Sequence, residues 1–257
     1  MRSIPGPIAL LVALIALAIV FAILQRFFRS VPAKPLLRRE RAIDFVYWFF
    51  TPWVGRAVTM LAVGIAVGLI VLLFGKPSSA WFEQQHVALQ IAELLVAADL
   101  LGYFAHRLFH RRRLWPFHAI HHSATDLDWL AATRLHPFNE AGQRLLQVLP
   151  LYLLGFRGTA LAAVIPFFTF YALFEHANLR WDFGPLRCVL ASPRFHRWHH
   201  TKAAEGKDKN FAGLFPWIDL LFGTYYLPRD RQPVDFGVDE DVPRGFIGQL
   251  AYPFRAQ

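Results

Sequence analysis

An almost uninterrupted apolar run over residues 5–24 constrains the fold of this chain more than any other feature. About 20 such residues, each adding about 1.5 Å of helix, span a bilayer core of about 30 Å. A cleaved signal peptide is the competing interpretation. However, the run is long for the apolar part of a signal peptide, no small-residue cleavage site follows it, and Arg26 and Arg29 lie just beyond it. The run therefore predicts a membrane anchor helix.

Further apolar runs over residues 57–74 and 87–105 are each long enough for a membrane span. A fourth region, residues 145–154 and 159–174, is interrupted by a glycine-containing break and predicts a hairpin of two helices. Apolar residues make up 55% of the chain, whereas soluble domains usually contain about 45–50%. Because the excess lies in these runs, we predict an all-α fold: a polytopic membrane helical bundle.

Lys and Arg are distributed unevenly among the segments that join these runs. Segments 25–56, 106–144 and 176–257 hold seven, six and eleven of them, whereas segment 75–85 holds one. Basic segments tend to stay on the cytoplasmic side of a membrane. The N-terminus is therefore predicted to lie outside and the three basic segments inside. Every histidine except His86 then falls on, or at the edge of, the cytoplasmic side.

The 11 histidines are the second unusual feature, because most of them occur in clusters. In the first cluster, His106 and His110 are four residues apart, on one face of a helix that continues the third apolar run. Asp99 and Tyr103 lie on the same stripe of this helix. The spacing predicts that both imidazoles point at one metal ion and that Asp99 supports the site from behind, by orienting an imidazole through its ring N–H.

The second cluster consists of His118, His121 and His122, which share one helical face through their i, i+3 and i+4 spacing. Trp115 and Pro116 precede this cluster, and a proline disfavours helix at the residue before it, so a break between two helices is predicted there. Only seven residues separate this cluster from the first one. The two clusters are therefore predicted to be neighbours in space.

The third cluster, His196, His199 and His200, has the same spacing as the second. Ser192 and Pro193 precede it, and this pair is typical of a helix N-cap followed by proline at the first helical position. A short helix is therefore predicted to present the three imidazoles. The three clusters together predict a histidine-rich helical cap on the cytoplasmic side of the bundle.

Three histidines lie outside the clusters. His136 precedes Pro137, where it either caps a turn or binds a metal ion. His176 ends the last apolar run on the predicted cytoplasmic side and is interpreted as a ligand. His86 lies at the opposite membrane edge and is interpreted as structural.

Eight clustered imidazoles exceed the four to six ligands that one ion holds, so they predict a dinuclear metal site. Neutral imidazole suits iron, zinc, copper and nickel. A structural zinc site is closed by four ligands, so the excess of donors indicates chemistry rather than structure. Cys188 is the chain's one cysteine, which excludes an intrachain disulfide and a cysteine-based zinc or iron–sulfur site.

These motifs resemble those of the fatty acid hydroxylase and sterol desaturase superfamily of integral membrane oxygenases. Residues 99–110 resemble its first histidine box, residues 118–123 its second and residues 196–200 its last. The Arg-Leu-His-Pro segment at 134–137 resembles a segment that follows the second box, and residues 210–228 resemble the stretch after the last box.

The resemblance covers about residues 90–228 and implies a dinuclear iron centre that uses O2 and two electrons from an external donor. It implies hydroxylation or desaturation of a C–H bond in a lipid, such as a fatty acyl, sterol-like, sphingolipid, alkylglycerol or carotenoid substrate. Zinc can replace iron in such nitrogen sites of a purified protein. The family pattern implies the following metal ligands: His106, His110, His118, His121, His122, His196, His199 and His200, with His176 as a ninth and His136 as a tenth.

A histidine-rich membrane metal transporter or metal-binding protein is the alternative function. A transporter needs ligands along a path near the middle of the membrane, where only Glu93 and Asp99 are found. A haem cytochrome needs paired histidines on different spans, whereas the histidines here are clustered at the membrane edge. A metallohydrolase needs a carboxylate base of the H-E-x-x-H kind, and neither cluster of three histidines contains a carboxylate. Nucleic acid is not an expected partner, because the basic residues behind the net charge of +9 flank apolar runs and indicate a membrane surface.

The chain shows no dinucleotide-binding glycine pattern, haem-attachment motif or cysteine set for an iron–sulfur cluster. Electrons are therefore expected from a separate reductase, cytochrome or ferredoxin-type donor. We divide the chain into N-terminal membrane helices with a basic cytoplasmic loop (1–85), a catalytic domain (86–228) and a loosely packed polar tail (229–257). Frequent Arg and Ala and the lack of an ER-retention tail favour a bacterial cytoplasmic membrane.

Overall fold

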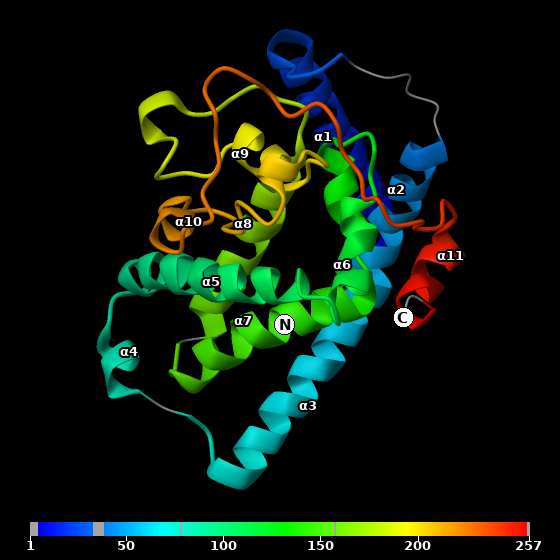
Figure 1. Cartoon of the computed structure of the whole chain (residues 1–257). Helices are drawn as coiled ribbons and strands as arrows, with labels where there is room; N and C mark the ends of the chain where they lie inside the picture. Colours follow the sequence, from blue (N-terminus) through cyan, green and yellow to red (C-terminus); the bar gives the residue numbers. More distant parts are fainter. Residues whose placement is uncertain (1–4, 33–38, 78, 157, 256–257) are drawn as a thin grey trace.

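The computed structural model describes residues 5–32, 39–77, 79–156 and 158–255. Within these residues every regular element is helical, and β-structure is confined to two isolated bridges (Figure 1). The predicted all-α fold is therefore confirmed. Lys34 and Arg38, which contribute to the basic count of segment 25–56, and Arg157 in the predicted hairpin break lie outside the described residues.

Four helical stretches are long and apolar enough to cross a membrane: α1 (Pro7–Phe28), Glu40–Phe74, α5 (Val87–Phe109) and α8 (Gly158–His176). Large apolar side chains on these helices face outward, as Leu72 does with 79% of its surface exposed. Lipid rather than water suits such a surface. The protein is therefore an integral membrane protein, as predicted.

The remaining elements are α2 (Arg39–Phe50), η1 (Thr51–Gly55), α3 (Arg56–Phe74), α4 (Ala80–Gln84), α6 (Trp115–His122), η2 (Trp129–Thr133), α7 (Pro137–Leu153), η3 (Gly184–Leu186), α9 (Pro193–His199), η4 (Ala204–Gly206), α10 (Trp217–Leu221), α11 (Phe246–Ala251) and η5 (Tyr252–Phe254). In the view of Figure 1, α9 and α10 lie above α5, whereas α3 and α4 extend below it. The histidine-bearing helices are thus gathered at one end of the membrane bundle.

The segment before the second span is helical rather than a basic loop. Helix α2 passes through the π-helical turn η1 directly into α3, and the continuous stretch Glu40–Phe74 within them has 35 residues. Pro52 lies in that turn, and a wider turn accommodates a residue that lacks an N–H and crowds the preceding turn. Thr51 fixes the turn by donating its hydroxyl to the Thr133 carbonyl at 2.8 Å. A Cβ on Gly55 would overlap the Glu140 carboxylate, so this glycine permits close packing against α7.

The predicted hairpin after the second histidine cluster has a longer first arm than expected. Helix α7 begins at Pro137, eight residues earlier than the apolar run suggested, because His136 caps it and proline occupies its first turn. The predicted break is present, since Gly155 adopts a positive φ of 88° between α7 and α8. Buried residues of α5, α7 and α8, among them Leu94, Leu151 and Val164, form the apolar core between these helices.

The C-terminal segment is packed, and the expectation of a loose tail was wrong. Phe246 of α11 lies edge-on to Tyr47 and Phe50 of α2, with ring centroids 5.1 and 4.9 Å apart. Phe236 and Gln249 are 4% and 2% exposed. The tail's few aromatic residues, rather than its polar composition, determine its packing, because each buries a large apolar area.

Candidate metal centre

Helix α5 carries the first histidine pair from the membrane into the cap. His106 lies in its last turn and His110 is its C-cap. One helical turn separates them, so their ring centroids lie 5.3 Å apart on one face. The helix was predicted to run out of the third span in this way.

The other two clusters lie on short helices that begin where the sequence predicted. Helix α6 starts at Trp115 with Pro116 in its first turn, and its three histidines are all buried. Helix α9 starts at Pro193, and the Ser192 hydroxyl accepts a hydrogen bond from the Phe195 N–H at 3.2 Å. The cap on Ser192 fixes the start of the helix and hence the direction of its imidazoles.

The structure gathers nine histidines into two adjacent groups, five in one and four in the other, whose potential ligand atoms all lie within 4.8 Å of one another in each group. The histidine sets of α6 and α9 each contribute two histidines to one group and one to the other, so both short helices connect the two groups. His176 at the end of α8 joins the smaller group. The first group is His106, His110, His118, His122 and His199, and the second is His121, His176, His196 and His200.

The Nε2 atoms within each group lie at the spacing of ligands around one ion. In the first group, the His118 Nε2 lies 3.0 Å from that of His106 and 3.2 Å from that of His122. In the second, the His176 Nε2 lies 3.1 Å from that of His121 and 3.3 Å from that of His196. Metal–imidazole bonds of about 2.0–2.1 Å place neighbouring ligand nitrogens about 3 Å apart. Both groups therefore match the geometry of a metal site.

Oxygen acceptors fix the tautomer of several imidazoles. The Nδ1–H groups of His106 and His199 donate to the Phe211 and Lys209 carbonyls at 3.0 and 2.7 Å. A carbonyl oxygen only accepts, so the proton lies on Nδ1 and the Nε2 lone pair is free for a metal ion.

Two further first-group histidines are oriented by polar side chains. The Asn139 Oδ1 lies 3.1 Å from the His118 Nδ1, and the Asp208 Oδ1 lies 3.0 Å from the His110 Nδ1. The Nδ1 of His176 in the second group donates to the carbonyl one turn earlier in α8 at 2.7 Å. Such acceptors hold imidazole rings in place and raise their basicity as ligands.

Unpaired buried nitrogens show that the residues suit bound cations. The Nε2 atoms of His110 and His199 have no hydrogen-bond partner among the described residues, although both atoms are buried. A buried polar atom without a partner is destabilising by about 1–3 kcal/mol, and native proteins rarely leave one unexplained. A metal ion within the first group would supply the missing interaction for both nitrogens.

Electrostatics keeps these imidazoles in the form that binds metal. Burial lowers the pKa of His118, His122 and His199 well below its ordinary value, and neighbouring imidazoles lower it further. Burial also lowers the pKa of His110, against the opposing hydrogen bond to Asp208. The rings are therefore neutral at neutral pH, and neutral imidazole is the ligand form.

Asp99 supports the site through a loop and not by direct contact with an imidazole, which corrects the expectation from its helical spacing. Its Oδ1 accepts from the Gly213 and Leu214 N–H groups at 2.8 and 3.1 Å. Its Oδ2 accepts from the Phe215 N–H at 2.7 Å. The same loop presents the Phe211 carbonyl to His106. Asp99 thereby positions an acceptor for the imidazole of His106, which lies seven residues away on the same helix.

Tyr103, the other residue predicted to support the site, also contacts this loop region. Its hydroxyl lies 3.0 Å from the Thr224 Oγ1 and accepts from Arg107 at 3.1 Å. Its ring lies edge-on to Phe211, with centroids 5.8 Å apart. Tyr103 thus packs behind the loop rather than against an imidazole.

His136 lies outside both histidine groups. Its Nδ1 accepts from the Phe138 N–H at 3.2 Å, and its Nε2 lies 3.2 Å from the Leu250 carbonyl. Both ring nitrogens are therefore engaged, and the structure favours the helix cap over the tenth ligand. We leave His136 out of the ligand set proposed below. His86 caps α5 by accepting from the Ala88 N–H, which agrees with its structural interpretation.

Sequence reasoning missed several polar residues that shape the site. Asp219 accepts from the Phe211 and Ala212 N–H groups at 2.8 and 2.9 Å, which makes it a second carboxylate under the same loop. Asn139, which orients His118, is 1% exposed. A polar residue within an otherwise apolar stretch, as in Leu-Phe-Pro-Trp-Ile-Asp219, was the one available signal.

Comparisons with known proteins identify the family. The sequence profile described as fatty acid hydroxylase matches residues 91–224. A protein named ornithine lipid hydroxylase OlsE, from Rhizobium tropici, is 36% identical over 250 residues, which cover 91% of this chain and 72% of that protein. An alkylglycerol monooxygenase from Danio rerio is 31% identical over 137 residues, 53% of this chain and 30% of that protein.

A more distant relative is named very-long-chain aldehyde decarbonylase GL1-5, from Oryza sativa subsp. indica. It is 28% identical over 140 residues, which cover 49% of this chain and 22% of that protein. No solved structure matches significantly. The profile match and the bacterial relative together show that the chain belongs to the fatty acid hydroxylase family and is an oxidoreductase that acts on lipids.

Proposed function

We propose that the protein hydroxylates a C–H bond of an acylated membrane lipid with O2, and that two iron ions bound by the nine grouped histidines carry the chemistry. The observation that carries this proposal is the division of the histidines into two adjacent groups of five and four. Hydroxylation is favoured over desaturation by the names of two relatives, a hydroxylase and a monooxygenase. The bacterial relative acts on an ornithine lipid, which makes an acylated amino acid the leading substrate class.

The two iron ions would supply O2 activation and the oxidation of an unactivated C–H bond, which no side chain achieves alone. The protein's own residues hold the imidazoles neutral and correctly turned, through acceptors such as Asn139 and the Phe211 carbonyl. The Phe211 and Trp115 rings lie 4.9 and 5.0 Å from the His110 ring. These rings cover the first group and limit the access of water to it.

Isotope incorporation tests this function. The iron-loaded protein, reconstituted in lipid with a chemical reductant, is exposed to 18O2 and its lipids are analysed by mass spectrometry. We expect one 18O atom in a hydroxylated acyl lipid. A product that loses two hydrogen atoms without gaining oxygen would instead show a desaturase, and no O2-dependent product from any lipid would contradict the proposal.

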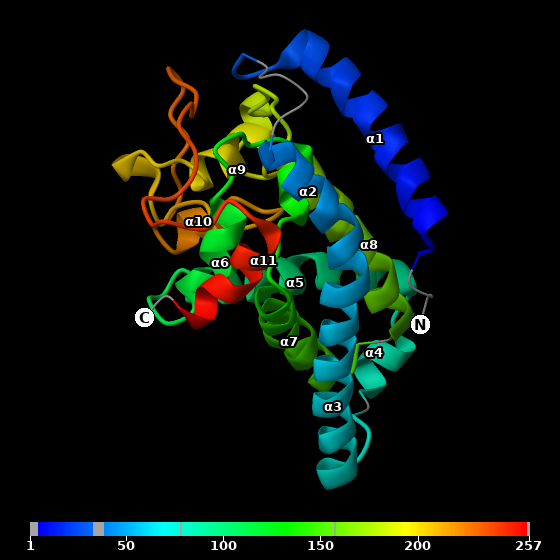
Figure 2. The same ribbon diagram turned by 90° about the vertical axis from the view of Figure 1, so that its right-hand side faces the viewer.

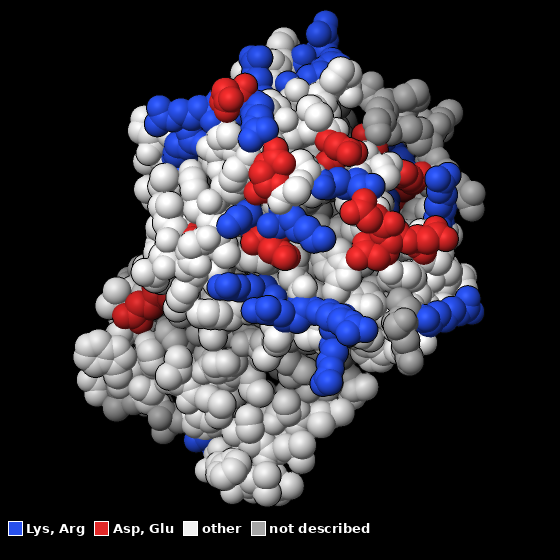
Figure 3. Space-filling model, viewed as in Figure 1, with Lys and Arg blue, Asp and Glu red and all other residues white. Residues whose placement is uncertain are grey.

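We also propose that a separate electron donor docks on the basic face beside His110. Arg111, Arg112 and Arg113 are exposed and follow this ligand directly, and Figure 3 shows Lys and Arg side chains in a belt across this face of the molecule. Trp115 is half-buried, and its ring lies 5.0 Å from that of His110. An acidic donor would match this charge.

Reversing this charge is expected to weaken the binding of the electron donor and to leave the metal site intact. In the variant Arg112→Glu/Arg113→Glu, the KM for an acidic ferredoxin should rise about tenfold or more, because rim charges govern the association of charged partners. Turnover with dithionite should stay at the wild-type level. Lys76→Glu, at the far end of α3, serves as the matched control. Equal ferredoxin KM values in all three proteins would contradict this docking face.

The proposed sidedness puts the histidine groups in the cytoplasm of a bacterial cell. The charge distribution supports it, because Lys76 is the one basic residue of segment 75–85. In a Cys188→Ser background, an impermeant maleimide should label Lys76→Cys in intact spheroplasts and Lys207→Cys only after permeabilisation. Both positions are exposed. The reverse pattern would place the site on the outer side.

A further inference from the structure

A cavity of about 450 Å³ lies between α1, α2 and η2, and none of the nine grouped histidines lines it. Figure 2 shows α1 at the edge of the molecule, beside α2 and α8. Both ends of α1 are tied to the rest of the protein. Near its start, the Trp48 Nε1–H donates to the Leu10 carbonyl at 2.9 Å. At its end, the Arg180 N–H donates to the Phe28 carbonyl at 2.9 Å. One wall of the cavity is therefore formed by a helix that is tied to the rest of the protein at both ends.

Positive charge dominates the polar wall of this cavity. Three arginines line it, Arg26, Arg29 and Arg41, against one carboxylate, Asp128. Arg41 pairs with Asp128 at 2.5 Å. Asp128 also accepts from the Leu130 N–H at 2.9 Å, so its carboxylate is fully engaged. Arg26 and Arg29 form no ion pair with any described residue, and their guanidinium groups are free for an anion.

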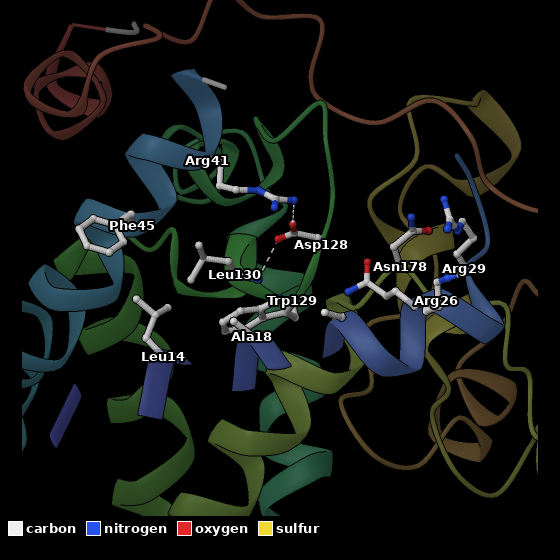
Figure 4. Close-up of a pocket in the computed structure, with 12 residues that line it drawn as sticks. Leu14, Ala18, Arg26, Arg29, Arg41, Phe45, Asp128, Trp129, Leu130 and Asn178 are labelled. Atoms are coloured by element: carbon white, nitrogen blue, oxygen red, sulfur yellow. Dashed lines mark hydrogen bonds and ion pairs between the residues drawn. The ribbon is translucent and has the colours of Figure 1, made fainter. Parts of the chain in front are cut away.

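The other wall of the cavity is apolar. Leu14 and Ala18 of α1 face Trp129 and Leu130 of η2 across it (Figure 4). Trp129 is held by stacking on Phe21, with ring centroids 5.2 Å apart. Figure 4 shows Arg41 with Asp128 on one side of the opening and Arg26 with Arg29 on the other, above this floor. A ligand that matches both walls carries an anionic group and an apolar chain.

Two residues that line the cavity pack against the end of α8 that carries His176. Trp129 and Leu130 pack in one buried cluster with Leu173 and Ala177, which flank His176 in sequence. Asn178 lines the cavity and lies two residues beyond this histidine. A lipid held here would thus lie beside the end of α8 that carries His176.

We propose that this cavity binds the anionic headgroup, a carboxylate or phosphate, of the acylated lipid that the enzyme oxidises. The role of this lipid as the substrate rests on the proposed function, whereas its binding rests on the cavity alone. Guanidinium groups bind carboxylate and phosphate through paired hydrogen bonds. Arg26 lies in the last turn of a membrane span, the level at which lipid headgroups lie. The volume suits a small ligand group.

Native mass spectrometry of the full-length, iron-loaded protein in detergent tests the binding. The probes are an N-acyl amino acid with a free carboxylate, phosphatidylglycerol, and phosphatidylcholine as the lipid without net charge. We expect one carboxylate or phosphatidylglycerol adduct on the wild type, weakened about tenfold or more in Arg26→Gln/Arg29→Gln. Arg26→Lys/Arg29→Lys should retain part of the adduct. Ala18→Trp keeps every charge but fills the cavity at its apolar wall, so this variant should also lose the adduct.

The matched control is Arg244→Gln/Arg255→Gln, which removes two exposed arginines that do not line the cavity. Its adduct should equal that of the wild type. An adduct that persists unchanged in Arg26→Gln/Arg29→Gln and in Ala18→Trp overturns the inference. Displacement of the lipid by an equal concentration of inorganic phosphate also overturns it, because the site would then bind a free anion.

The role of the bound lipid as substrate is tested on the same proteins. With wild-type iron content, Arg26→Gln/Arg29→Gln should raise the KM for the carboxylate lipid about tenfold or more and change kcat little, because a contact that holds substrate and transition state equally well affects KM alone. If the wild type forms product and the KM of this variant is unchanged, the inference is overturned, and the proposed hydroxylase function still stands. A wild type that binds the lipid but forms no oxygenated product contradicts the proposed function and leaves the binding supported.

Discussion

Replacing His176 with alanine is expected to abolish lipid oxidation, by at least about 100-fold, since loss of even a residue behind a metal ligand reduces activity by about 10–100-fold. The His176 Nε2 lies 3.1 Å from that of His121 and 3.3 Å from that of His196. Its removal leaves the second group with three imidazoles. The measurement is product formed per minute at saturating lipid, alongside the metal content of the same sample.

His136→Ala provides the matched comparison, because the sequence left His136 as either a turn cap or a tenth ligand, and in the structure its Nδ1 caps α7. Its activity should stay within about threefold of the wild type. Loss of the cap should lower stability by about 1 kcal/mol. Equal loss of activity and metal in the two variants would return His136 to the ligand set. Full activity in His176→Ala would remove His176 from it.

Asp99→Ala is expected to destabilise the protein by about 3 kcal/mol or more. It leaves the buried Leu214 N–H group and the half-buried Gly213 and Phe215 N–H groups without their acceptor. A fully buried group of this kind is destabilising by about 1–3 kcal/mol. The loop that carries the Phe211 carbonyl should loosen first. We therefore expect a lower Tm in detergent and faster amide hydrogen exchange over residues 211–215, together with weaker retention of metal.

The control for this prediction is Asp230→Ala, which changes an exposed carboxylate and should leave the Tm unchanged. Asp99→Asn keeps the shape of the side chain but turns an amide donor toward N–H groups, so it should resemble Asp99→Ala. A wild-type Tm in both Asp99 variants would show that Asp99 does not hold the loop.

The sequence predicted the elements whose signals are local. Histidine spacing and the Ser192-Pro193 pair located helix α9, which carries the last cluster, and continuous apolar runs located the membrane spans. Each of these features depends on the period or the ends of a single helix, so a short window of sequence is sufficient. The expected enzyme class followed from the same motifs and is confirmed by the family match.

Contacts between distant segments were not predictable from these local patterns. Asp99 and Phe215 are 116 residues apart in sequence, and helical spacing aligned Asp99 with His106 although its partners lie in a loop. The basic segment before the second span was predicted as a loop, but α2 and the π-helical turn that contains Pro52 carry a helix through it. The C-terminal segment is polar in composition, and its packing depends on aromatic partners in α2. Tertiary contacts decide each of these cases.

Counting metal ions in the anaerobically purified protein tests the central claim most directly. His121→Ala and His199→Ala each remove one ligand from a different group. We predict about two iron ions per wild-type chain and the loss of about one or more in each variant, because metal affinity depends on the full ligand set. One zinc ion or no metal in the wild type, unchanged in both histidine variants, would contradict the dinuclear iron site.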